Sequence, residues 1–190
     1  LLISDVYCWD ANLEKLNFPI EKGLTNLIKF TIKFSQKYKF KMKIAARSKL
    51  NNFIKEKEFY KKNLSKNEYE FLLKNIFFRS ENHKTYKIMQ KSKIVIGTMS
   101  TMLRENLSLN GKTFACNFTN TNIFDFPIKG LCFSKNMNYE NFEKQLSKIY
   151  KISLKEYYNQ LSEKRYYVCK NNSNKTIELI NKKVRFLIRN

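Results

Sequence analysis

Glycine and proline are scarce in this chain of 190 residues, which holds 4 glycines and 2 prolines. Linkers and domain boundaries are usually rich in such residues, so the sequence gives no sign of a second domain. No apolar run approaches the roughly 20 residues that a membrane-spanning helix needs. We therefore expect a single domain over residues 1–190, large enough to bury a substantial core.

Residue types that commonly bind metals are also few. Histidine occurs once, as His83, and the four cysteines lie far apart without a Cys-x-x-Cys pair: Cys8, Cys116, Cys132 and Cys169. This spacing argues against a zinc site, and we expect no metal. Three of the cysteines stand beside apolar or aromatic residues, which is typical of reduced, buried thiols in a cytoplasmic protein.

Acidic residues are outnumbered, since 37 lysines and arginines face 16 acidic residues and the net charge is +21. A basic surface attracts nucleic acid, acidic lipid or phosphorylated small molecules. Most of the basic residues are lysines scattered along the whole chain, which favours a general affinity for anions. We expect no specific nucleic-acid partner, because no RRM, KH, zinc-finger or helix-turn-helix signature is present. A basic nucleic-acid-binding module remains the alternative.

Hydrophobic residues make up 43% of the chain and aromatic residues 15%, which supports a real core. Their spacing predicts short strands that alternate with longer helices. The expected strands are 1–9 (running into a loop), 41–46, 75–79, 93–97, 112–118 and 130–134. The expected helices are 21–38, 53–64, 84–92, 100–110, 139–150, 153–162 and 174–188. Repeated strand–helix units predict an α/β fold with a Rossmann-like, mainly parallel sheet and helices on both faces.

The stretch 91–119, KSKIVIGTMSTMLRENLSLNGKTFACNFT, has the clearest pattern. Its Ile-Val-Ile run is typical of a strand covered on both faces, and Gly97 follows it directly. Open α/β sheets bind ligands at the carboxyl ends of strands, where helix N-termini also point. The hydroxyls and backbone N–H groups after Gly97 are therefore suited to hold a phosphate at the start of the next helix.

Glu105 lies about one helical turn beyond these hydroxyls. A carboxylate there would repel a phosphate beside it, but it is able to accept two hydrogen bonds from the vicinal diol of a ribose. The pattern thus predicts a nucleotide site. The alternative is that Ser100 caps the helix and Glu105 is an ordinary first-turn acid favoured by the helix dipole. The turn is neither a P-loop nor a GxGxxG fingerprint.

Over about residues 40–135, this sequence resembles the C-terminal half of GT-B glycosyltransferases that make bacterial surface carbohydrates such as capsule and lipopolysaccharide. Epimerases of UDP-N-acetylglucosamine and polyol-phosphate (CDP-glycerol type) transferases have similar turns. The resemblance implies a donor-nucleotide-binding half and metal-independent glycosyl transfer. It also implies a nucleotide-sugar as donor substrate, no cofactor, and a glycan or lipid-linked acceptor.

In that family the Ser-Thr turn contacts the donor diphosphate and the glutamate holds the ribose. Carried over, the resemblance implies ligand-binding roles for Arg47, Gly97, Thr98, Ser100, Thr101 and Glu105. Arg47 is included because KIAARSK resembles a family strand that ends in a basic residue near the donor phosphates. Arg104 stands where the family often has glycine, and it would add to phosphate binding.

No residue is assigned as catalytic, because in GT-B enzymes the general base commonly comes from the N-terminal domain. The residues of this chain considered for such a role are His83, Asp5 and Asp10. Four tyrosines are candidates for stacking on a base or sugar, with a place in the core as the more frequent role: Tyr157, Tyr158, Tyr166 and Tyr167.

The chain begins with leucine instead of methionine, so we expect a fragment of a longer two-domain chain. We expect a cytoplasmic location. The basic surface would hold the protein against anionic lipid at the inner face of the cell membrane, where lipid-linked acceptors reside.

Overall fold

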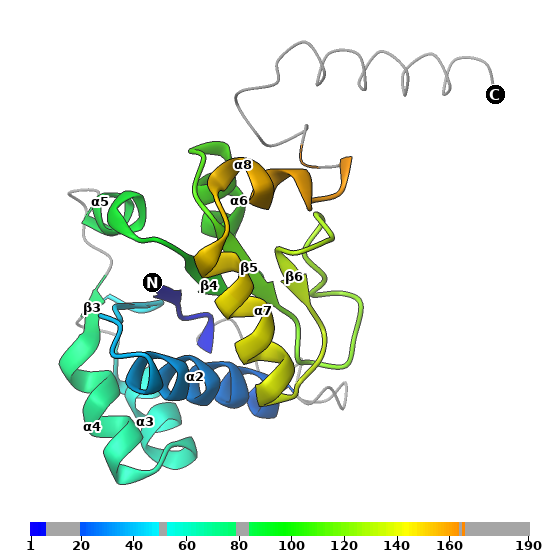
Figure 1. The fold of residues 1–190 in the computed structure, drawn as a ribbon. Helices are drawn as coiled ribbons and strands as arrows, with labels where there is room; N and C mark the ends of the chain where they lie inside the picture. Colours follow the sequence, from blue (N-terminus) through cyan, green and yellow to red (C-terminus); the bar gives the residue numbers. More distant parts are fainter. Residues whose placement is uncertain (7–19, 50–52, 79–83, 164, 166–190) are drawn as a thin grey trace, which may run out of the picture.

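The computed structural model describes residues 1–6, 20–49, 53–78, 84–163 and 165 of the chain. Six strands form one sheet in the order β3-β2-β1-β4-β5-β6, and every neighbouring pair is parallel (Figure 1). The strands are β1 (Leu2–Ile3), β2 (Ile44–Ala46), β3 (Ile76–Phe78), β4 (Val95–Gly97), β5 (Thr113–Cys116) and β6 (Phe133–Ser134). This strand order is that of the Rossmann-like folds, so the predicted fold class is confirmed.

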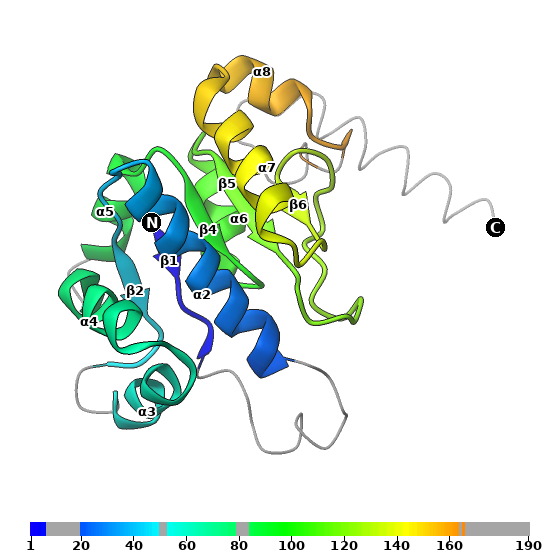
Figure 2. The same ribbon diagram turned by 60° about the horizontal axis from the view of Figure 1, so that its bottom comes forward.

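Helices cover both faces of the sheet. They are α2 (Ile20–Lys37), α3 (Ile54–Asn63), α4 (Lys66–Asn75), α5 (Lys84–Lys91), α6 (Thr101–Ser108), α7 (Tyr139–Lys151) and α8 (Leu154–Asn159). The chain moves from β1 to β2 in one direction across the sheet and from β4 to β5 in the other, so right-handed crossovers place α2 and α6 on opposite faces. α2 contacts α7, and Figure 2 shows both in front of the sheet with α6 behind it. Among the described helices, none is long and apolar enough to cross a membrane.

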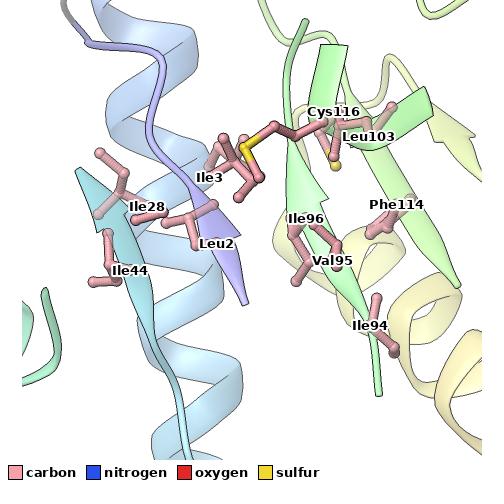
Figure 3. Packing of buried hydrophobic residues seen from close by; sticks show 14 of the residues in the cluster. Leu2, Ile3, Ile28, Ile44, Ile94, Val95, Ile96, Leu103, Phe114 and Cys116 are labelled. Atoms are coloured by element: carbon pink, nitrogen blue, oxygen red, sulfur yellow. The ribbon is translucent and has the colours of Figure 1, made fainter. Parts of the chain in front are cut away.

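The centre of the sheet is buried on both faces, as expected for parallel strands. Leu2, Ile44 and Ile96, from β1, β2 and β4, lie in one row and are at most 5% exposed. Figure 3 shows Ile28 of α2 close to the strands of this row, and Leu103 of α6 near β4 and β5. The apolar runs that predicted the strands therefore form the core of the molecule.

Most predicted elements occur close to their expected bounds, but α4 was missed. The strand predicted at 75–79 is present as β3, and α4 runs directly into it. α4 begins with a capping box: the Ser65 hydroxyl accepts from the Glu68 N–H, and the Glu68 carboxylate accepts from the Ser65 N–H. The predicted helix 174–188 lies outside the described residues.

α6 ends earlier than the predicted residue 110, and Gly111 has a different role from the one expected. Asn110, with φ 60°, takes the left-handed conformation that closes the helix, so Gly111 is not the residue that stops it. A Cβ at Gly111 would lie 2.2 Å from Oδ1 of Asn106. The Asn106 amide donates to the carbonyl of Lys112 and the hydroxyl of Thr113. The glycine therefore makes room for a side chain that ties α6 to β5.

Candidate functional site

The carboxyl ends of β2, β1 and β4 lie side by side, because the register aligns Ile44 with Leu2 and Leu2 with Ile96. The order of strands reverses between β1 and β4, and this switch point is where open α/β sheets bind ligands. The candidate site is therefore built from the segments that follow these strands, residues 4–5, 47–48 and 98–101.

The turn after β4 carries most of the predicted residues. Gly97 is the last residue of the strand, Thr98 and Ser100 are buried, and Thr101 is the exposed first residue of α6. Ser100 occupies the N-cap position, but its side chain makes no capping hydrogen bond. The alternative role of Ser100 as a side-chain cap is therefore wrong, and its hydroxyl is not engaged by the helix.

Asp5 occupies part of this turn. Its carboxylate is 2% exposed, and Oδ2 accepts long hydrogen bonds from the N–H groups of Thr98 at 3.4 Å and Met99 at 3.3 Å. Two of the N–H groups that the sequence assigned to phosphate are thus directed at a protein carboxylate. The N–H groups of Thr101 and Met102, in the first turn of α6, have no acceptor within the helix. These two hydrogen bonds link the residues after β1 to the turn after β4.

Glu105 lies on the same helix as Thr101, about 6 Å further along the axis. It is half-buried, and Oε2 accepts a hydrogen bond of 2.7 Å from the hydroxyl of Tyr86 on α5. The first turn of α6 contains no acidic residue, so the alternative of Glu105 as a first-turn acid is also wrong. Among the described residues, Oε1 of Glu105 has no hydrogen-bond partner.

Arg47 follows β2, and β1 separates it from the turn after β4. Strand spacing puts the ends of β2 and β4 about 10 Å apart, so Arg47 lies on the same edge as Ser100 without joining the turn. Its side chain is exposed. The structure therefore brings Gly97, Thr98, Ser100, Thr101 and Glu105 into one segment, with Arg47 beside it.

A buried carboxylate that sequence reasoning missed holds the turn after β2. Glu56 of α3 is 0% exposed and accepts hydrogen bonds from the hydroxyls of Ser4 (2.6 Å) and Tyr60 (2.5 Å). It also accepts from the N–H groups of Arg47 (3.2 Å) and Ser48 (2.9 Å). Burial, and then the charge of Glu56, raise the pKa of Tyr60 well above its ordinary value. The position of Glu56 on the face of α3 that carries Tyr60 was a signal available in the sequence.

A pocket of about 540 Å³ opens at the opposite, amino edge of the sheet. Its lining includes Lys93 and Lys112, which precede β4 and β5. The Lys112 ammonium donates to the carbonyls of Ile149 and Ile152 at the C-terminal end of α7, and burial followed by the charge of Lys93 lowers its pKa. Because the lysine serves a helix end and the pocket lies away from the switch point, we do not place the site there.

The other candidates have structural roles or lie outside the described residues. The Tyr157 hydroxyl bonds the backbone of Thr113, and the Tyr158 hydroxyl donates to carbonyls of α6 and the residues after it. Cys116 and Cys132 are buried as predicted, and burial raises the pKa of the Cys116 thiol well above its ordinary value. Outside the described residues lie Cys8, Asp10, His83, Tyr166, Tyr167 and Cys169.

No family model matches the chain, and no curated protein or solved structure matches it either. The class of protein is therefore defined by the fold: a Rossmann-like α/β protein with a parallel sheet. The likeness to GT-B glycosyltransferases remains a prediction from the sequence.

Proposed function

We propose that this chain is the donor-binding part of a GT-B glycosyltransferase for surface polysaccharide, with a nucleotide-activated sugar as its substrate. The observation that carries the proposal is the strand order, since it puts the turn 97–101 and the N-terminus of α6 at the switch point of the sheet. Helix N-termini at this place are suited to phosphate groups.

The donor diphosphate binds at the start of α6 in this proposal. The hydroxyls of Ser100 and Thr101 and the N–H groups of the first helical turn are its hydrogen-bond donors. The carboxylate of Asp5 lies nearby and would repel the diphosphate. The exposed side chains of Arg47 and Arg104 are the basic groups that offset this repulsion. The same groups stabilise the departing diphosphate during sugar transfer, without need of a metal.

Glu105 binds the ribose. Its Oε1 and the remaining lone pair of Oε2 are acceptors for a vicinal diol. A polyol-phosphate transferase or a sugar epimerase would use the same nucleotide site. The identity of the bound nucleotide substrate distinguishes these enzymes from a glycosyltransferase. A nucleic-acid-binding module is the second candidate, favoured by the net charge of +21.

Thermal-shift titrations test the proposal. The ligands are UDP, CDP, GDP, CMP, UDP-N-acetylglucosamine, CDP-glycerol and a short oligonucleotide, each at low and high salt. The proteins are wild type, Glu105→Gln and the control Glu140→Gln, which alters an exposed acid on α7. We expect one nucleoside diphosphate and its sugar conjugate to stabilise wild type, by about 2.7 kcal/mol at one hundred times the dissociation constant.

Glu105→Gln should lose most of that stabilisation and Glu140→Gln should keep it. Stabilisation by CDP-glycerol instead of a nucleotide-sugar would favour the polyol-phosphate transferase. Stabilisation by the oligonucleotide alone, lost at high salt, would overturn the proposal in favour of nucleic-acid binding. Absence of any shift with all nucleotides would overturn it as well.

A further inference from the structure

Glu105 is held by a neutral hydroxyl in a protein rich in cations. The ion pairs of the described residues join lysines to Glu21, Asp125 and Glu143, and none includes Glu105. The neighbouring Arg104 is exposed. Glu105 therefore has no cation partner among the described residues, although the chain holds 37 basic and 16 acidic residues. The Glu105 carboxylate is therefore able to accept hydrogen bonds from a ligand.

The Tyr86 hydroxyl restrains this carboxylate. The terminal torsion of a glutamate is broad, so an unrestrained carboxylate samples many orientations. A charge-assisted O–H···O bond of 2.7 Å from a separate helix selects one of them before a ligand arrives. Tyr86 is 37% exposed and Glu105 is half-buried, so the pair lies at the surface, within reach of a ligand. Such preorganisation lowers the entropic cost of binding.

We infer that Tyr86 is a positioning residue for Glu105, and that the pair makes the site selective for ribonucleotides over 2′-deoxyribonucleotides. The inference rests on the proposed function, in which Glu105 accepts from the ribose. A diol donates two hydrogen bonds to an oriented carboxylate, whereas a 2′-deoxyribose donates one and leaves an acceptor desolvated.

Isothermal titration calorimetry tests this inference by comparing the affinity of the protein for UDP with its affinity for 2′-deoxy-UDP. If the thermal-shift screen selects another base, the nucleotide pair carries that base instead of uracil. The proteins are wild type, Tyr86→Phe, Glu105→Gln and the double variant. Tyr69→Phe is the control: Tyr69 is a half-buried tyrosine on a different helix, α4. We expect wild type to prefer the ribonucleotide about tenfold, the size of one hydrogen bond.

Tyr86→Phe should weaken the ribonucleotide several-fold and the 2′-deoxy form less, because the 2′-deoxyribose makes only one of the two hydrogen bonds, and the preference should therefore fall. In the Glu105→Gln background the same substitution should have no further effect, because Tyr86 acts through the carboxylate. Tyr69→Phe should match wild type.

An unchanged preference in Tyr86→Phe would overturn the inference and leave nucleotide binding standing. Equal weakening of both nucleotides would also overturn it, because Tyr86 would then act on another part of the ligand. If wild type binds neither nucleotide, the proposed function fails and this inference with it.

Discussion

Glu56 and Glu105 are carboxylates near the same edge of the sheet, one beside the turn after β2 and the other behind the turn after β4. Glu56 is 0% exposed and receives hydrogen bonds from two backbone N–H groups and two hydroxyls. Glu105 is half-buried and receives one, from Tyr86. A buried carboxylate that receives all its hydrogen bonds from the protein has a structural role. A half-buried carboxylate with an oxygen that receives no hydrogen bond from the protein is able to accept one from a ligand.

The largest expected effect comes from Glu56→Gln. The amide NH₂ of glutamine would face hydroxyl and N–H donors, and at least one of them would lose its acceptor in a buried place. We expect the free energy of unfolding to fall by about 3 kcal/mol, measured by urea denaturation.

Glu58→Gln on the same helix is the control, because Glu58 is exposed. Its effect should stay within about 0.5 kcal/mol. If Glu58→Gln lowered the free energy of unfolding by a similar amount, or if Glu56→Gln did not lower it, the structural role of Glu56 would be contradicted.

Tyr60 gives the next effect, at alkaline pH. Its pKa in the folded state is held well above the ordinary 10.0. A group with a raised folded-state pKa contributes stability below its unfolded pKa, and that stability is lost as the pH rises towards the folded pKa. Above about pH 10, wild type should lose about 1.4 kcal/mol per pH unit more than Tyr60→Phe. Denaturation curves at several alkaline pH values measure the two slopes, and equal slopes would contradict the prediction.

The smallest expected effect is a difference in stability between alanine substitutions of two serines, each at the N-cap of a helix. Ser65 caps α4 through its side chain, and Ser100 occupies the N-cap of α6 without a side-chain bond. Ser65→Ala should therefore cost about 1 kcal/mol of stability and Ser100→Ala less than about 0.5 kcal/mol. Thermal melts of the two variants compare them. A larger loss in Ser100→Ala would mean that its hydroxyl stabilises the turn, which would weaken its assignment to a ligand.

Local patterns were enough to predict most of the fold. The apolar run before Gly97 and the helical spacing of Leu24, Leu27 and Ile28 are properties of short segments, and β4 and α2 occur where these patterns lie. α4 was missed although Ser65 and Glu68 form a capping-box pattern that the sequence displays.

The candidate site was predicted only in part. Residues 97–105 are continuous in sequence, so their common location followed from one strand–helix unit. The partners of this segment come from distant positions: Asp5 lies 93 residues before Thr98, and Tyr86 lies on a separate helix from Glu105. Their hydrogen bonds depend on the directions of whole elements, which no local pattern specifies.

The alternation of strands and helices can be derived from the sequence alone, because the period of apolar residues depends on local backbone geometry. The sequence also places hydroxyls and a carboxylate behind one strand. Which carboxylates are enclosed and which remain accessible depends on how the helices and strands pack against one another. The burial of a side chain and the number of hydrogen bonds it receives depend on neighbouring residues from several helices and strands. The strand order, which brings β2, β1 and β4 together, determines those neighbours.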